Sequence, residues 1–297
     1  MPKTHYAILA GTIMGTIARF YLLRVDYRQY PSYPQGYTIH LTFGAIAAAL
    51  GAVTIPAILN KDYSAVTFIA LAAQHFRDVR KLERESLEKI EQDELVKRGQ
   101  AYIEDISKKF ESRNYVAMLT GLATVLAIYI TKKILFGIIT GLVVLTVMRF
   151  AIKPRTIETI AEVKPAKIHF KGSLLAVDNI VLTNVGLKEA RKKLLNDALA
   201  VKIIPKDDNA RVTLANIGQR QAIIHDIVSI LGIRQERDEP EFTPISKRDP
   251  DSGNVVIVAL VREPDIECMI EVVKKAPLLE ASRRQPLDTY IGRKAAD

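Results

Sequence analysis

Several features by which soluble enzymes are recognised are missing from this sequence. Its single cysteine, Cys268, cannot form an intrachain disulfide, so nothing indicates an oxidising compartment. The G-x-G-x-x-G and G-x-x-x-x-G-K-[ST] nucleotide motifs are absent, and so is the G-x-S-x-G motif of serine hydrolases. We therefore name no catalytic residue, no cofactor and no metal ligand, and the prediction leans against an enzyme.

Acidic residues are also missing from five apolar stretches. These stretches cover about residues 6–23, 38–58, 63–76, 115–130 and 134–152. A bilayer-crossing helix needs about 20 apolar residues, so the third stretch, with fourteen residues, is short. We predict a polytopic α-helical membrane protein with about five transmembrane helices. The lack of intramembrane carboxylates argues against a wide aqueous pore.

The distribution of positive charge predicts how the chain is oriented in the membrane. The formal net charge is +9, and ten Lys and Arg residues lie between positions 77 and 114. If all five stretches cross and the N-terminus is outside, this segment is cytoplasmic and only Lys61, Lys132 and Lys133 face out, as the positive-inside rule requires. If 63–76 did not cross, the rule would be violated. Acids interleave with the bases, which is not the pattern of a nucleic-acid surface.

We therefore divide the chain into four parts: three N-terminal spans (1–76), a polar cytoplasmic segment (77–114), a transmembrane hairpin (115–152) and a soluble domain (153–297). The polar segment is predicted to hold a helix from Arg77 to Arg98 that Gly99 interrupts, followed by a second amphipathic helix. Two interpretations of it remain open. It is a solvated helical elbow, or a basic surface that holds anionic lipid.

Small residues repeat at four-residue spacing in the apolar stretches. The glycines of these seams are Gly11, Gly15, Gly44, Gly137 and Gly141. Such spacing lets two helices approach closely. It predicts a close-packed bundle, and the same seams could join copies of the chain in a homo-oligomer.

Two arginines stand in or next to apolar stretches. Arg19 lies four residues before the end of the first stretch, and Arg149 lies near the end of the last. Arg19 can reach the interface as an anchor, or it can serve an ion or substrate. His40, which has no metal-ligand neighbour at i+3 or i+4, is predicted to be interfacial.

The connection between the first two stretches is rich in tyrosine and proline. It contains Tyr27, Tyr30, Tyr33 and Tyr37 among Pro31, Pro34 and Gly36. Tyrosine favours the headgroup level, so an interfacial belt is one interpretation and a surface for a protein partner is the other. Together with Tyr102, Glu104 and Phe110 of the polar segment, these tyrosines are our candidate partner residues.

Residues 153–297 have the composition of a small cytoplasmic α/β domain. Short strands are predicted at 167–170, 173–177, 180–182 and 199–204, and a strand buried on both faces at 255–261. Helices are predicted at 187–196 and 213–231 and after Asp265. The alternation of strands and helices indicates the α/β class.

We predict structural roles, and no catalytic or metal-binding roles, for the polar residues of this domain that resemble known motifs. Asp207-Asp208-Asn209 is predicted to cap a helix or form an Asx turn, and Asp249-x-Asp251-x-Gly253 to form a simple turn instead of a calcium loop. Cys268 is predicted to be a structural thiol, and His225 to lie at the edge of a packed helix face.

The segment Tyr102-Ile103-Glu104-Asp105-Ile106-Ser107 resembles the signature of the YIEGIA family of bacterial membrane proteins. Two other stretches carry the resemblance, Arg24 to Pro31 and Val212 to Gln221. Asp105 and Ser107 replace the Gly and Ala of the signature. The resemblance implies a multi-pass membrane location in a member of the Bacillota and a sporulation context, and it implies no mechanism.

Three functional hypotheses follow. The first is a non-enzymatic membrane anchor or scaffold that presents its α/β domain to protein partners. The second is a component of a small-solute transporter or channel, based on Arg19, Arg149 and the short third stretch. The third is a membrane-bound ligand sensor or enzyme that binds a small anion at a helix N-terminus.

Overall fold

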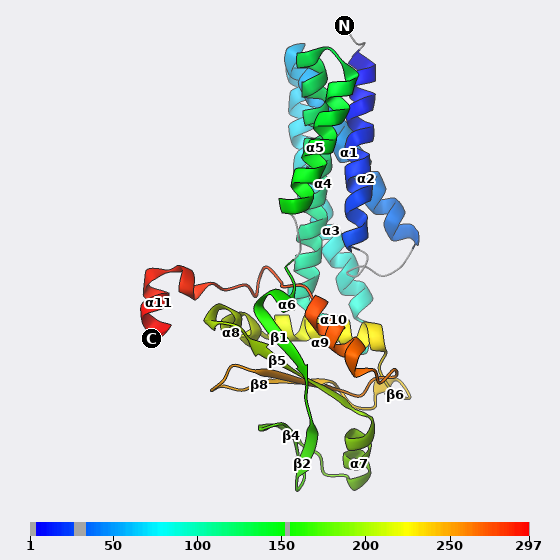
Figure 1. The fold of residues 1–297 in the computed structure, drawn as a ribbon. Helices are drawn as coiled ribbons and strands as arrows, with labels where there is room; N and C mark the ends of the chain where they lie inside the picture. The colour runs from blue at the N-terminus through cyan, green and yellow to red at the C-terminus, as the bar shows by residue number, and fades with distance from the viewer. Residues whose placement is uncertain (1–3, 27–33, 152–154, 297) are drawn as a thin grey trace. The chain divides into compact units, whose positions relative to one another are not determined.

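The computed structural model describes residues 4–26, 34–151 and 155–296, which form two compact units (Figure 1). The helical unit comprises residues 1–86 and 106–153, and the α/β unit comprises 87–105 and 154–297. The chain therefore passes between the units three times. The predicted polar segment 77–114 is divided between both units, and only its middle part belongs to the α/β unit.

Each of the five apolar stretches forms a helix. The helices are α1 (Thr4–Asp26), α2 (Pro34–Leu59), α3 (Tyr63–Glu91), α4 (Gln100–Thr131) and α5 (Ile134–Ala151). Three segments are long and apolar enough to cross a membrane: Thr4–Leu23, Gly36–Leu59 and Gln100–Thr131. Tyr63–Ala72 and Ile134–Phe150 are shorter apolar helices.

The predicted glycine seams pack helices of the same chain against one another. A Cβ placed on Gly11 would lie 2.6 Å from Val125 Cγ2, and one on Gly15 would lie 2.5 Å from the Cβ of Ala48. A Cβ on Gly141 would likewise lie 2.7 Å from Thr124 Oγ1. Close packing of the bundle is therefore confirmed, and these seams serve contacts inside the chain.

The helix predicted from Arg77 to Arg98 is wrong at both ends. It is the continuation of α3 and ends at Glu91. A turn then brings Val96 into the core of the α/β unit, where it is 8% exposed. Glu91 accepts a 2.6 Å hydrogen bond from the amide of Gly99, whose φ is +89°. Burial of Val96 outweighs the helix propensity of this stretch.

Between residues 155 and 296, the α/β unit contains six further helical segments and nine short strands. The helices are α6 (Ile157–Ile160), α7 (Lys188–Asp197), α8 (Asp208–Ala215), α9 (Ile217–Leu231), α10 (Ile266–Lys275) and α11 (Tyr290–Ala296), with a 3₁₀ turn at Pro286–Asp288. The strands are β1 (Ala161–Pro165), β2 (Ile168–Lys171), β3 (Leu174–Val177), β4 (Ile180–Asn184), β5 (Leu199–Pro205), β6 (Gln235–Glu236), β7 (Glu239–Pro240), β8 (Ile245–Arg248) and β9 (Val255–Ala259).

The α/β unit has three layers. Its main sheet has the order β1-β5-β9-β8 with every pair antiparallel, and β2-β3-β4 form a second sheet. Val255 and Ile257 of β9 belong to the core that includes residues of α9 and α10, while Val256 and Val258 pack on the second sheet. Figure 1 shows the helices α9 and α10 on one side of the main sheet and β2 on the other. The prediction that this strand is buried on both faces is confirmed.

The local predictions for this unit have mixed outcomes. Asp207 and Asp265 cap α8 and α10, and the turn at Asp249–Gly253 is present. The predicted residues 213–231 are helical except at Asn216, but they belong to two helices instead of one. Asn216 ends α8 and caps α9 through a 3.1 Å bond from Gln219 N. Ile217 is consequently 75% exposed and does not join the packed face. The edge strands β1 and β8 were not predicted.

Candidate functional site

The 87–105 segment is fixed to α9 of the α/β unit by polar contacts. Gln221 donates a hydrogen bond from Nε2 to the carbonyl of Lys97. A Cβ on Gly218 would lie 2.8 Å from the Cβ of Ala101, so glycine permits the close approach. Asp105 accepts a 3.1 Å bond from the amide of Glu280 at the other end of the segment. Residues far apart in sequence thus complete one folded unit.

His225 lies at the centre of this contact, where it is 8% exposed. Its Nδ1 is 2.9 Å from the carbonyl oxygen of Val96, and its Nε2 is 3.1 Å from Ser229 Oγ. A proton on Nδ1 would donate to Val96 and leave Nε2 to accept from Ser229. Burial lowers the pKa of His225, and the charge of Arg98 lowers it further, against opposing effects of Val96 and Glu94.

The α/β unit is expected to lose stability in mild acid because of His225. A histidine whose pKa is lower in the folded than in the unfolded protein stabilises the fold fully above the unfolded pKa of about 6.5. As the pH falls below about 6.5, the unfolded state takes up a proton first. The free energy of unfolding then decreases by at most about 1.4 kcal/mol per pH unit. Urea denaturation of the purified protein between pH 7.5 and 5 should show the decline. His225→Gln should flatten it, whereas His169→Gln in β2 should not. Equal slopes in both variants would contradict this role.

Tyr102 joins α4 to α9 within the same unit. It is 2% exposed, and its hydroxyl donates a 3.0 Å hydrogen bond to Asp226 Oδ1. Its ring meets the His225 ring edge to face at 6.2 Å. Tyr102 is therefore engaged inside the chain, and we remove it from the candidate partner residues.

Tyr102→Phe is expected to destabilise the α/β unit by about 1–3 kcal/mol, because a bond to a charged acceptor is lost in a buried place. Tyr290→Phe provides the control, since Tyr290 is 74% exposed. Urea midpoints of the two variants would make the comparison. A Tyr102→Phe midpoint equal to that of wild type would show that the bond to Asp226 contributes nothing.

Arg19 is wholly buried in the helical unit and does not reach the outside of the bundle. Its Nη2 is 2.9 Å from His40 Nδ1, and its guanidinium lies 5.5 Å from the centre of the Phe110 ring. A Cβ on Gly44 would collide with the Arg19 side chain. The predictions of a snorkelling Arg19, an interfacial His40 and a partner-facing Phe110 are corrected, because the Arg19 guanidinium contacts His40 and the Phe110 ring inside the helical unit.

The other predicted residues lie elsewhere. Arg149 is exposed and lies 5.2 Å from the ring centre of Tyr21. Tyr37 is 46% exposed and Glu104 is half-buried. The remaining candidate tyrosines fall outside the described residues: Tyr27, Tyr30 and Tyr33. Cys268 is a half-buried free thiol.

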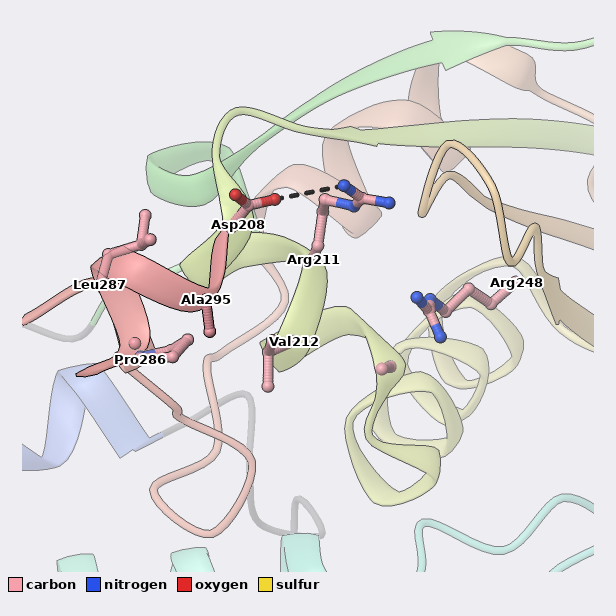
Figure 2. A pocket seen from close by; sticks show the side chains of 9 residues that line it. Asp208, Arg211, Val212, Arg248, Pro286, Leu287 and Ala295 are labelled. Atoms are coloured by element: carbon pink, nitrogen blue, oxygen red, sulfur yellow. Dashed lines mark hydrogen bonds and ion pairs between the residues drawn. The ribbon is translucent and has the colours of Figure 1, made fainter. Parts of the chain in front are cut away.

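A pocket of about 530 Å³ opens in the α/β unit (Figure 2). Its lining comes from α8, from the end of β8 and from the C-terminal segment: Asp208, Arg211, Val212, Ala215, Arg248, Pro286, Leu287, Gly292 and Ala295. This volume is in the range of small-molecule sites. In the described parts of the chain, no group of three His, Cys, Asp or Glu residues is placed to hold a metal ion.

The C-terminal segment is held beside this pocket by Gln219, which is fully buried. Gln219 Oε1 accepts from the amide of Leu279 at 2.9 Å and from Ser282 Oγ at 2.7 Å, and its Nε2 donates to the carbonyl of Pro277 at 2.9 Å. Asn209 adds a 3.0 Å bond to the amide of Leu287. Gln219 therefore fixes residues 277–282, which lead to the pocket wall, and Asn209 fixes Leu287 within that wall.

Comparison with known proteins identifies the family of this chain. The family model described as "YIEGIA protein" matches residues 7–289. The chain belongs to the YIEGIA family. A Bacillus subtilis (strain 168) protein named "Uncharacterized protein YphB" is 40% identical over 283 residues, which are 95% of this chain and 95% of that protein. No solved structure matches the chain.

The resemblance based on residues 102–107 is thus confirmed. In this YIEGIA protein the signature lies in the first turns of α4. Tyr102 bonds to Asp226 of α9, and Asp105 accepts from the amide of Glu280. The second stretch of the resemblance, 212–221, contains Gln219 and the pocket residue Val212. The importance of Gln219 was missed because nothing in the sequence reveals the partners that a buried amide will meet. Arg248 was missed because it follows a polar loop that resembles solvent-exposed chain.

Proposed function

We propose that this YIEGIA protein is an integral membrane scaffold that presents its α/β unit to protein partners in the cytoplasm. It would cross the membrane five times, with the N-terminus outside and residues 77–114 and 153–297 inside. One observation carries the proposal. Residues 87–105 and 154–297 form one compact unit, which supports a topology with both in the same aqueous compartment.

The intervening helices are compatible with this topology. The helices α4 and α5 lie between the two parts of the α/β unit and would cross as a pair, which returns the chain to its starting side. The helix α4 has 32 residues, which at 1.5 Å per residue is about 48 Å. Its first turns can therefore belong to the aqueous unit while the remainder spans about 30 Å of hydrocarbon.

The buried polar side chains of the α/β unit have structural contacts, which is more typical of a scaffold than of an enzyme site. His225, Tyr102 and Gln219 are each engaged in contacts that hold the unit together. The surface offers three exposed leucines. Leu187 caps α7 and Leu195 lies in it, at 71% and 49% exposed. Leu174, 41% exposed, begins β3, which pairs with the strand β2 that α7 contacts. We call these three leucines the partner surface.

In-cell photocrosslinking from Leu187 and Leu195 tests the scaffold. The same protein adduct is expected from both positions in repeated preparations, and Leu174→Ser should weaken it. A crosslinker at Glu267 of α10 is the matched control and should not give that adduct. Adducts that do not recur, or that appear equally from Glu267, would count against a partner at this surface.

A second candidate function, solute transport, is favoured by the buried Arg19 and His40 pair in the helical unit. Polar groups inside a membrane bundle are costly and often mark a substrate path. Liposomes containing the protein would be loaded with anions and cations in turn and their flux compared with that of Arg19→Met. Flux at the level of empty liposomes would dismiss transport.

A further inference from the structure

The pocket of the α/β unit has an arginine-rich side and an apolar side. Figure 2 shows Arg248 extending in from one side, Arg211 and Val212 on α8, and Pro286, Leu287 and Ala295 of the C-terminal segment opposite. Arg211 is held in place by Asp208, at 3.2 Å from its Nη1, and by the carbonyl of Asp251, at 2.7 Å from its Nη2. The apolar wall is continuous with the segment held by Gln219.

The positive charge at this pocket is only partly compensated. Burial is the main cause that lowers the pKa of Arg220 in α9, and the nearby charge of Arg248 lowers it further. The Nε atoms of Arg220 and Arg248 are buried and have no hydrogen-bond partner within the described residues. With Asp208 neutralising Arg211, the guanidinium of Arg248 leaves the pocket lining with a charge of about +1 at neutral pH, because arginine stays protonated. Arg220 adds a second positive charge near Arg248.

The two neighbouring arginines, Arg220 and Arg248, would be stabilised by a bound anion. Buried donors without acceptors cost stability, and neighbouring guanidinium groups repel each other. Arginine forks match the geometry of phosphate oxygens, and a phosphate monoester carries a charge of about −1.5 to −2 at pH 7. The apolar wall opposite would accept a non-polar part of the same molecule.

We propose that this pocket binds a phosphate monoester that carries an apolar group. Arg248 and Arg211 contact the phosphate, Arg220 supplies charge behind Arg248, and Val212 with Leu287 contacts the apolar part. Such a molecule can be a soluble metabolite or the head of a phosphatidate lipid, since both present the same phosphate chemistry. This proposal does not depend on the scaffold function, because a scaffold without partners could still bind the ligand.

Calorimetry of the full-length protein in detergent micelles and phosphate-free buffer tests the site. Phenyl phosphate represents the soluble source and dihexanoyl phosphatidic acid the lipid source. A dissociation constant below about 1 mM is expected for at least one of them, with benzyl alcohol showing none. Tighter binding of phenyl phosphate identifies a soluble ligand, and tighter binding of the short-chain phosphatidate identifies a lipid.

Two variants and one control decide whether binding occurs in this pocket. Arg248→Gln should weaken binding by about tenfold or more, since it removes a charge-assisted donor pair. Val212→Glu places a negative charge in the pocket at a residue that is 42% exposed, so it should fold and also abolish binding. Arg262→Gln, an exposed arginine of the same unit, should bind as wild type does. No binding by the wild-type protein, or unchanged binding by Val212→Glu, would overturn the proposal.

Discussion

Replacing Gly15 with leucine is expected to lower the melting temperature of the purified protein by about 10 °C or more. A Cβ at this position already lies 2.5 Å from the Cβ of Ala48 and meets the carbonyl oxygen of Ala117. Neither group can move without displacing helix backbone, and overpacking of this kind costs about 3 kcal/mol. About 3 kcal/mol corresponds to that shift for a unit of this size.

Gly36 provides the matched control for this experiment. It lies in α2 of the same unit, and a Cβ added there would meet nothing within 4 Å. Gly36→Leu should therefore melt close to wild type when helical circular dichroism is followed on heating. A similar loss in both variants would mean that glycine content, and not the close approach at Gly15, determines bundle stability.

Gln219→Ala is expected to produce the largest loss in the α/β unit. Its amide makes three hydrogen bonds to the C-terminal segment from a fully buried position. Removing it leaves buried donors and acceptors in Leu279 and Pro277 without this partner, at about 1–3 kcal/mol for each group. We expect a total of about 3 kcal/mol or more and release of the segment that forms one pocket wall.

Urea denaturation and limited proteolysis measure the two consequences separately. Gln219→Ala should lower the urea midpoint and make the chain after about residue 277 sensitive to protease under native conditions. Gln235→Ala, at an exposed position of β6, should change neither. A resistant C-terminal segment in Gln219→Ala would show that Asn209 and the apolar contacts suffice to hold it.

The parts of the fold that depend on local pattern could be predicted from the sequence. Apolar length predicted each helix of the helical unit, and the carboxylates of Asp207 and Asp265 predicted two helix starts. The β-branched run at 255–259 predicted a strand buried on both faces. In each case the residues responsible are adjacent in sequence, so their pattern carries the information.

The parts that failed depend on contacts between distant residues. Nothing local indicates that Val96 will be buried near His225, which ends α3 early and fixes 87–105 to the α/β unit. The strand β8 is half-exposed and polar, so its own residues give no strand pattern. It forms a strand because it pairs with β9. The prediction for Arg19 treated its helix as isolated, but in the structure His40 and Phe110 of other helices lie against its side chain.

The same dependence limits what could be predicted of the site. Arg248 and Arg211 are 37 positions apart, and the C-terminal wall comes later still. The stretch 212–221 was singled out by its resemblance, but its physical role depends on where the chain places Pro277 to Ser282. A pocket formed by three distant segments has no continuous sequence pattern.

Cysteine accessibility in intact cells tests most directly whether the two parts of the α/β unit share the cytoplasm. In a Cys268→Ser background, single cysteines would replace four exposed residues: Asn60, Asp93, Lys133 and Glu263. A membrane-impermeant maleimide should label positions 60 and 133 in intact cells, and positions 93 and 263 only after the membrane is opened. Labelling of 93 and 263 on opposite sides would contradict the account, because one folded unit cannot be assembled across a bilayer.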